Sequence, residues 1–515
     1  MTAPVPCLAA GLVVPHHLNW LDWLVIAAYG FAMLGIGWFY SRRNKTREDY
    51  FLGGREMKPT AVGLSLFATL LSSISYLSCP GEMIKHGPVL FFTFLSYPFI
   101  ILVVGWFMIP FFMRLPVTSA YEILETRLGV KVRLLGAVLF LSLRLLWMAM
   151  IIYTTTDKVL IPLTGIHPSL SPLICALIGA VTIIYTSAGG LRAVVFTDVA
   201  QTLILFAGAI LTLAVITTTL GGLGAWWPNQ WYESWDHPRI WFGSSDRTIA
   251  GGFLAAFVWY ICTCGSDQMA IQRYLSTRDV KSARSAFTIS MVTDAVVTLF
   301  LGAIGLALLA YFRVHPEMLP SGQTISSGAD QLFPRFIVTG LPTGVGGLVV
   351  AALLAAAMSS LSSGLNSSSS VISVDLLERF RPTTRSEAEH VRLNRRISIV
   401  VGTIVVGLSL YVSTVQGNLL EVAYKVSNLF VAPLFFLFFM AMFVSWATPF
   451  GTLVGASVSI SVAVGIAHFH LLGLDFLWIM PGSLVAGIIT GVIASLAPVG
   501  YARQLLPTAS PDENG

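Results

Sequence analysis

The chain has 515 residues, of which 55% are hydrophobic and only 11% are charged, and its mean hydropathy is +0.78. Soluble domains carry about 25% charged residues, so this composition excludes an ordinary soluble protein. The net charge of +5 is small, and the basic residues form no single stripe, which argues against nucleic-acid binding. The composition predicts an all-α polytopic membrane protein.

Apolar runs of about 20 residues recur along the chain and predict about 13 transmembrane helices. Residues 1–19 precede them as a tail without the basic stretch of a signal peptide. The first run is a leader helix, and the others are numbered one to twelve. We place the thirteen helices over residues 20–40, 57–84, 88–113, 133–162, 169–188, 194–219, 249–271, 285–312, 341–377, 397–415, 420–446, 450–471 and 476–499.

The basic residues set the expected orientation. One set of alternating loops holds 22 of the 30 Lys and Arg residues. Cytoplasmic loops are enriched in these residues, so this set is expected to be cytoplasmic. The N-terminus is then outside and the C-terminus inside.

Two predicted helices contain uncharged runs of hydroxyl side chains at membrane depth. One run lies between Gly63 and Ser75, and the other lies between Ser359 and Ser370. Hydroxyls can support a locally broken helix whose free carbonyls face a cavity, and pairs of broken helices are typical of transporter sites. Close helix packing through small residues is the alternative, but it explains this density of hydroxyls poorly.

Neither run contains a carboxylate. Calcium and magnesium favour oxygen ligands that include carboxylates, and zinc needs His, Cys or carboxylate ligands. Carbonyls and hydroxyls alone can hold sodium or potassium, which have one charge to compensate. The runs therefore indicate a monovalent cation.

Arg144, Asp294 and Lys425 are charged residues inside predicted spans. An ionisable residue at this depth suggests a functional site. A structural ion pair is the alternative, and we favour it for Lys425 with Glu421, four residues earlier on the same helix. For the other two we favour a role in a pocket or gate. The alternative is that Arg144 and Asp294 neutralise each other as an ion pair.

Several short motifs lie in order along residues 20–450 and together resemble the sodium/solute symporter family. They are Asp49–Arg55 (DYFLGGR), the helix with Ser72 and Ser73, Thr118–Glu122 (TSAYE), Gly189–Asp198 (GGLRAVVFTD), Gln272–Leu275 (QRYL) and the serine run. The resemblance implies a LeuT-like 5+5 inverted repeat that couples uptake to sodium by alternating access. Its parts would be two five-helix repeats over 57–219 and 249–446, accessory helices over 450–499 and a cytoplasmic tail over 500–515.

The resemblance also implies ligands for sodium. The common sodium site of the family would take backbone carbonyls of Ala68, Leu71 and Ala356 and hydroxyls of Ser359 and Ser360. Some members have a second sodium site, whose equivalents in this chain are Ser359, Ser362, Ser363 and Asp198. One sodium ion, or two, is therefore expected.

The substrate pocket departs from the family pattern. Members that carry sialic acid have an arginine and a glutamine where this chain has Trp147 and Phe94, and a galactose-carrying member has a lysine where it has Asp294. Hydroxyl positions of that pocket are retained. The substrate candidates are Ser72, Ser73, Ser75, Phe94, Arg144, Trp147, Tyr260 and Asp294.

The sequence therefore predicts a sodium-coupled symporter, not an enzyme, that imports a small polar organic solute such as a sugar, sialic acid or organic acid. An ion channel, or a membrane sensor or enzyme on the same scaffold, is the alternative. The expected partners are the solute, sodium and the lipid bilayer of a bacterial inner membrane, and the sequence leaves the oligomeric state open.

Overall fold

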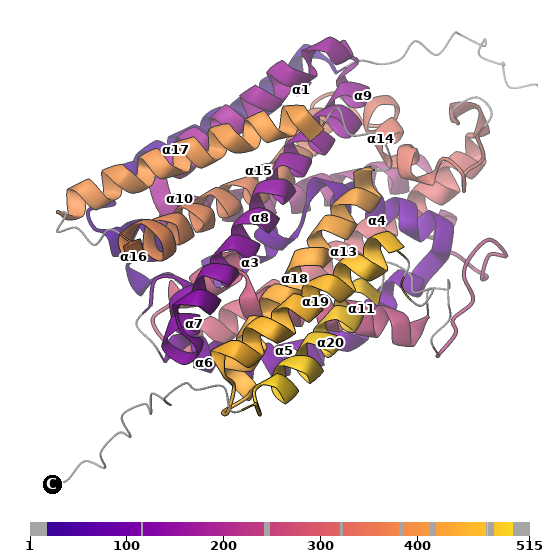
Figure 1. The fold of residues 1–515 in the computed structure, drawn as a ribbon. Coiled ribbons are helices and arrows are strands. Elements are labelled where there is room, and N and C mark those ends of the chain that lie inside the picture. Colours follow the sequence, from indigo (N-terminus) through magenta and orange to yellow (C-terminus); the bar gives the residue numbers. More distant parts are fainter. Residues whose placement is uncertain are drawn as a thin grey trace, which may run out of the picture.

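The computed structural model describes residues 18–114, 117–241, 248–319, 323–380, 386–412, 419–469, 471 and 478–497, without the side chains of Leu90 and of residues 419–426. The regular secondary structure of this part of the chain is all helical (Figure 1). Its α-helices are α1 (Trp20–Ser41), α2 (Arg47–Leu52), α3 (Pro59–Leu70), α4 (Ser73–His86), α5 (Tyr97–Val103), α6 (Ile109–Met113), α7 (Ala120–Leu128), α8 (Val130–Thr154), α9 (Ile161–Thr164), α10 (Ser171–Thr219), α11 (Ile249–Ser266), α12 (Gln268–Leu275), α13 (Val280–Val314), α14 (Ala329–Thr339), α15 (Val345–Val371), α16 (Glu378–Phe380), α17 (Glu387–Val412), α18 (Leu419–Phe443), α19 (Pro449–Phe469) and α20 (Ile479–Ala494).

Each predicted span coincides with a helical segment. Within the described residues, nine segments are long and apolar enough to cross a membrane, ten if a broken pair counts as one, and two more apolar helices are shorter. The 49-residue α10 holds two predicted spans, because Gly190 interrupts its helical geometry at φ 56° and ψ −159°. The expectation of a polytopic all-α membrane protein is confirmed.

Two helices are broken near the middle of the bundle. The chain bends by 71° between α3 and α4, where Leu71 and Ser72 have extended backbones. Asp267 is likewise extended between α11 and α12. Ser72 and Asp267 each cap the second half, with side-chain oxygens 3.2 Å and 2.9 Å from backbone nitrogens. Both breaks leave the last carbonyls of α3 and α11 without helical partners.

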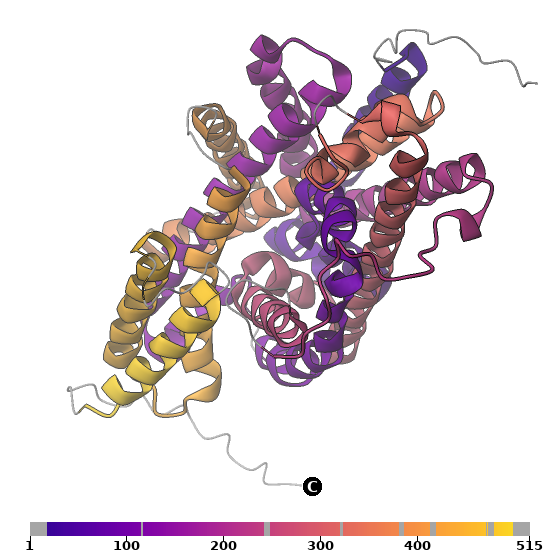
Figure 2. The ribbon, with the colours of Figure 1, turned by 90° about the vertical axis from the view of Figure 1, so that its right-hand side faces the viewer.

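The serine-rich α15 lies at the centre of the bundle. It packs against α10, α1, α8, α17 and α3, and almost all of its side chains are buried. Helices α18, α19 and α20 (orange to yellow) form a layer along one side (Figure 2). Helices α9 and α14 lie at one end of the molecule, and α6 and α7 lie at the opposite end (Figure 1).

Candidate functional site

Hydroxyls of α15 face the break between α3 and α4. The Ser359 Oγ lies 2.6 Å from the Ala68 carbonyl and 3.2 Å from the Ala356 carbonyl. The Ser360 Oγ lies 3.2 Å from the carbonyls of both Thr69 and Leu71. The structure thus brings the five residues of the expected sodium site together.

This cluster is buried and carries no charge. Ser359 is 0% exposed and Ser360 is 3% exposed. The main-chain oxygens are available because α3 ends at Leu70 and its last turn has no following turn to donate hydrogen bonds. Sequence reasoning missed the Thr69 carbonyl, which lies beside Ser360 as closely as the predicted Leu71 carbonyl. The donor set can hold a monovalent cation.

The candidate second cation site contains an arginine that was not expected there. The Nη2 of Arg273 lies 2.9 Å from the Asp198 carboxylate and 2.6 Å from the Ser363 Oγ. Ser65 donates to the same carboxylate at 2.5 Å. Ser362 instead donates to the carbonyl of Ser359 at 3.0 Å. All these side chains are buried, so Asp198 already has a cation as partner.

Arg273 falls between the predicted spans 249–271 and 285–312, and was therefore expected in a loop. In the structure it lies on α12, the second half of broken helix six, and is 1% exposed. The motif QRYL was visible in the sequence, but nothing in it showed that the short helix turns into the core.

Aromatic side chains from three helical segments surround Asp294 of α13. The hydroxyl of Tyr97 donates to its Oδ2, and Tyr260 lies against Tyr97 with ring centroids 5.6 Å apart. Phe94 packs on the other side of Tyr97, with ring centroids 5.2 Å apart. The structure therefore unites the predicted Phe94, Tyr260 and Asp294 through Tyr97, which sequence reasoning missed.

The possible pair between Arg144 and Asp294 is wrong. Arg144 instead pairs with Asp267, the residue at the break of helix six, and both side chains are less than a tenth exposed. The sequence did not predict the break of helix six, so Asp267 was not expected as the partner of Arg144. Trp147 lies one turn further along α8 and is half-buried. The proposed pair of Glu421 and Lys425 lies outside the described side chains.

The three predicted serines of helix one have different surroundings. The hydroxyls of Ser72 and Ser75 lie 3.0 Å apart. Ser73 lies 2.7 Å from Thr155, on the helical segment that continues α8. Ser72 and Ser75 therefore stay together at the start of α4, whereas Ser73 joins this helix to the α8 segment.

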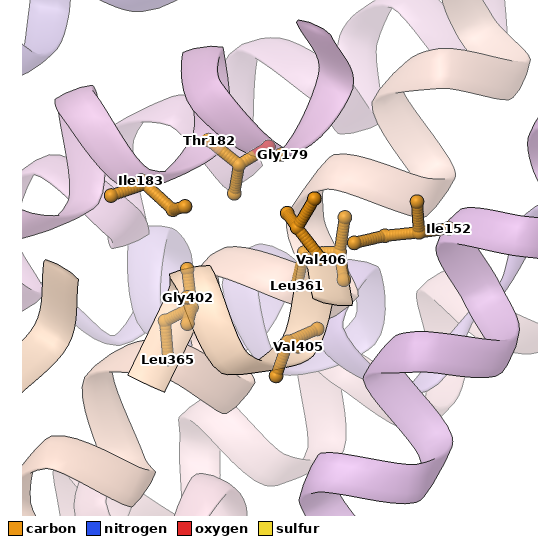
Figure 3. Close-up of a pocket in the computed structure, with 9 residues that line it drawn as sticks. All are labelled: Ile152, Gly179, Thr182, Ile183, Leu361, Leu365, Gly402, Val405 and Val406. Atoms are coloured by element: carbon orange, nitrogen blue, oxygen red, sulfur yellow. The ribbon is translucent and has the colours of Figure 1, made fainter. Parts of the chain in front are cut away.

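A separate, small apolar pocket lies between α8, α10, α15 and α17 (Figure 3). The hydroxyl of Thr182, its one polar side chain, donates to the Ile178 carbonyl at 2.8 Å. No predicted site residue lines this pocket, and it offers no free polar group for a solute. Its lining is Ile152, Gly179, Thr182, Ile183, Leu361, Leu365, Gly402, Val405 and Val406.

A buried ionic network joins helices at the end of the molecule that carries α7. Arg133 donates to Asp375 at 2.7 Å and to Glu125 at 2.6 Å. Ser119 donates to the other Asp375 oxygen at 2.5 Å. Partial burial of Glu125 opposes its ionisation, but hydrogen bonds from Arg133 and Arg379 outweigh this and lower the pKa of its carboxyl. The network ties α7 and α8 to the segment that follows α15.

Comparison with known proteins identifies the family of this chain. The model of the sodium:solute symporter family matches residues 50–459. The sodium/sialic acid symporter SiaT of Proteus mirabilis is 32% identical over 495 residues, which are 92% of this chain and 95% of that protein. The sodium-dependent multivitamin transporter of Oryctolagus cuniculus is 30% identical over 94% of this chain and 74% of its own length.

A solved structure supports the same assignment. It is described as a substrate-bound outward-open state of a sodium-coupled sialic acid symporter, and it superposes with a TM-score of 0.82 at 30% identity. The match covers 95% of this chain and 100% of that one. The LeuT-like fold expected from the motifs is confirmed. The chain therefore belongs to the sodium:solute symporter family: it is an integral membrane transporter that couples solute movement to sodium, and it is not an enzyme.

Proposed function

We propose that the five oxygens of Ala68, Leu71, Ala356, Ser359 and Ser360 bind the sodium ion that drives import of a small polar organic solute. The observation that carries this proposal is the contact of both serine hydroxyls with carbonyls at the broken end of α3. Carbonyls that lack helical partners at this depth need a donor or a cation, and here they meet the serine hydroxyls. Sodium supplies one charge, and no carboxylate is needed to balance it.

Sodium at this site would join α15 to the broken end of α3, because its ligands come from α3, from Leu71 at the break and from α15. An ion that binds one conformation more tightly than another shifts the population toward that conformation. Sodium would thus stabilise the state that receives solute. A potential of about 100 mV and a tenfold sodium gradient together supply about 3.7 kcal/mol per ion, enough for roughly 500-fold accumulation.

One sodium ion per cycle is the stoichiometry that we propose. A second ion at Asp198 would share that carboxylate with Arg273, whose guanidinium lies 2.9 Å away. Two cations on one buried carboxylate repel each other strongly. A second ion would therefore require Arg273 to move.

The charged residues near the breaks limit the class of solute that the protein can carry. Arg144 is neutralised by Asp267, so it offers no free positive charge to an acid. Asp294 would repel an anion that lay beside it. Among the expected classes, sialic acid and other organic acids therefore fit these residues less well than a solute whose group beside Asp294 carries no negative charge.

We also propose that the end of the molecule with α6 and α7 faces the cytoplasm of a bacterial plasma membrane. Most Lys and Arg residues of the chain lie in loops expected on one side. Arg133 and Arg379 of the α7 network belong to that set. The N-terminus would then be outside and the C-terminus inside.

Thermal unfolding of the purified protein at increasing sodium concentration tests the sodium site. Sodium should raise the midpoint, potassium at equal ionic strength should not, and Ser360→Ala should weaken the apparent sodium affinity about tenfold or more, because a hydrogen-bonding group on an ion contributes about 1.5–3 kcal/mol. Ser369→Ala is the matched control, since that hydroxyl donates to its own helix at 2.6 Å.

Transport is tested in liposomes with the same variants. A sodium gradient should drive uptake of a solute from a panel of sugars, sialic acids, monocarboxylates and amino acids. Equal sodium responses of the Ser360→Ala and Ser369→Ala proteins would refute this site.

A further inference from the structure

The carboxylate of Asp294 lies at the level of the broken helix. N-terminal to Asp294 on α13, Ala286 and Ile289 lie against Gly63 of α3. C-terminal to Asp294, Gly305 lies against Pro80 of α4. The two stretches therefore run side by side in the same direction. Asp294 lies about 12 Å along α13 from Ala286, given a rise of about 1.5 Å per residue. Leu71 lies the same number of residues after Gly63, at the break and among the ligands of the proposed sodium site.

Aromatic rings form the walls around this carboxylate. Tyr97 holds Asp294 through its hydroxyl, and its ring meets Tyr260 edge to face. Phe94 and Trp259 extend the group on either side, with ring centroids 5.2 Å and 4.8 Å from the two tyrosines. Aromatic faces carry negative potential and attract cations within about 6 Å. Both the carboxylate and the rings therefore favour positive charge.

Asp294 differs from the other acids of the core. Asp198, Asp267 and Asp375 each pair with an arginine, whereas no cation among the described residues pairs with Asp294. As a residue, Asp294 is intermediate in exposure, while those three are buried. An ionised acid at this depth is costly without a positive partner. Partial exposure leaves it open to a partner that arrives with the solute.

We propose that Asp294, Tyr97 and Tyr260 bind a positively charged ammonium group of the transported solute. This inference rests on the proposed function and names its substrate class. The Tyr97 hydroxyl holds one carboxylate oxygen and fixes the acid, while the rings supply surface to the alkyl groups around the nitrogen. Sodium is a poorer occupant, because the carboxylate and two phenols of this group offer fewer oxygens than the five of the proposed sodium site. A solute with both charges is included, provided that its ammonium end lies here.

Choline and its neutral isostere 3,3-dimethylbutan-1-ol test the proposal, because they differ in charge and hardly in shape. With sodium present, choline should raise the unfolding midpoint of the wild-type protein by about 2 °C or more at concentrations of tens of millimolar, and the isostere should not. Asp294→Asn keeps a hydrogen-bond acceptor for Tyr97 and should abolish the choline shift. Asp157→Asn is the matched control, because Asp157 also accepts from a tyrosine, Tyr153, at 3.1 Å but lies outside the cluster.

The sodium response separates this inference from the proposed function. Asp294→Asn should retain the full sodium-induced shift, which also shows that the variant is folded, whereas Ser360→Ala should need about tenfold more sodium to reach it. The inference is overturned if choline does not stabilise the wild-type protein, if the isostere stabilises it equally, or if Asp294→Asn keeps the choline shift. Loss of the sodium shift in Asp294→Asn would assign Asp294 to sodium and equally overturn it. None of these results depends on whether Ser360 binds sodium.

Discussion

The ion pair of Arg144 and Asp267 connects α8 to the break of helix six. Both side chains are less than a tenth exposed, and Asp267 also accepts from the backbone nitrogen of Met269 at 2.9 Å. Attraction within a buried pair roughly offsets the cost of removing both charges from water. Losing one partner is different, because the remaining charge is then buried alone. The pair therefore fixes the position of the break more than it adds net stability.

Asp267→Asn should destabilise the protein by about 3–5 kcal/mol, because it leaves Arg144 unpaired. Asparagine still caps a helix well, so loss of the cap does not account for the effect. The double variant Arg144→Met with Asp267→Asn should recover most of the loss, as measured by denaturant unfolding in detergent. Asp330→Asn, which removes the partner of Lys85 from a pair whose acid is 58% exposed, should cost less than about 1 kcal/mol. A double variant as unstable as Asp267→Asn would contradict this account.

At the scale of elements, the reversal inside α10 depends on one glycine. Gly190 has φ 56°, and a Cβ there would lie 2.6 Å from the carbonyl oxygen of Tyr50 on α2. Asn44 donates to the neighbouring carbonyl of Gly189 at 2.8 Å. The short α2 is therefore held in the corner between two spans. The motif containing Gly189 and Gly190 thus has a packing role that is separate from the role of Asp198 at its end.

Gly190→Ala should lower the thermal midpoint clearly, because both the backbone angle and the nearby main chain resist a Cβ. Gly129→Ala is the matched control, since Gly129 also has positive φ, 87°, but nothing lies within 4 Å of a Cβ there. The control should show only backbone strain, about 1–3 kcal/mol. The additional destabilisation of Gly190→Ala relative to Gly129→Ala measures the clash with α2. Equal thermal midpoints of the two variants would refute this clash.

At the scale of the whole molecule, the sequence predicted what local patterns determine. Apolar length located every span, and the absence of carboxylates in two serine runs indicated a monovalent cation before any contact was known. Pairings across the fold were not predictable in this way. Arg144 and Asp267 are 123 positions apart, and Arg273 and Asp198 are 75 apart; each pair forms only because a short helix after a break turns inward. Tyr97 was missed because nothing local distinguishes it from other aromatic residues of a span.

The network of Asp375, Arg133 and Ser119 closes one end of the bundle, which we propose to be cytoplasmic. It joins α7, α8 and the segment after α15, all of which are buried around Asp375. Alternating access, which the resemblance to the family implies, would require this end to open during the cycle. The hydrogen bonds of Asp375 must then weaken or break, so they contribute to the free energy that keeps this end closed.

Asp375→Asn should therefore favour opening of this end. The probe is a cysteine at Ser370, which is buried beside Gln268, in a chain whose native cysteines are replaced. A maleimide applied from the cytoplasmic side should label Ser370→Cys about tenfold faster with Asp375→Asn than without it, because a charged hydrogen bond contributes about 1.5–3 kcal/mol. Sodium should slow labelling in both proteins. Asp279→Asn, which removes an exposed acid on the same side, should not change the rate, and equal rates in the two variants would exclude a closing role for Asp375.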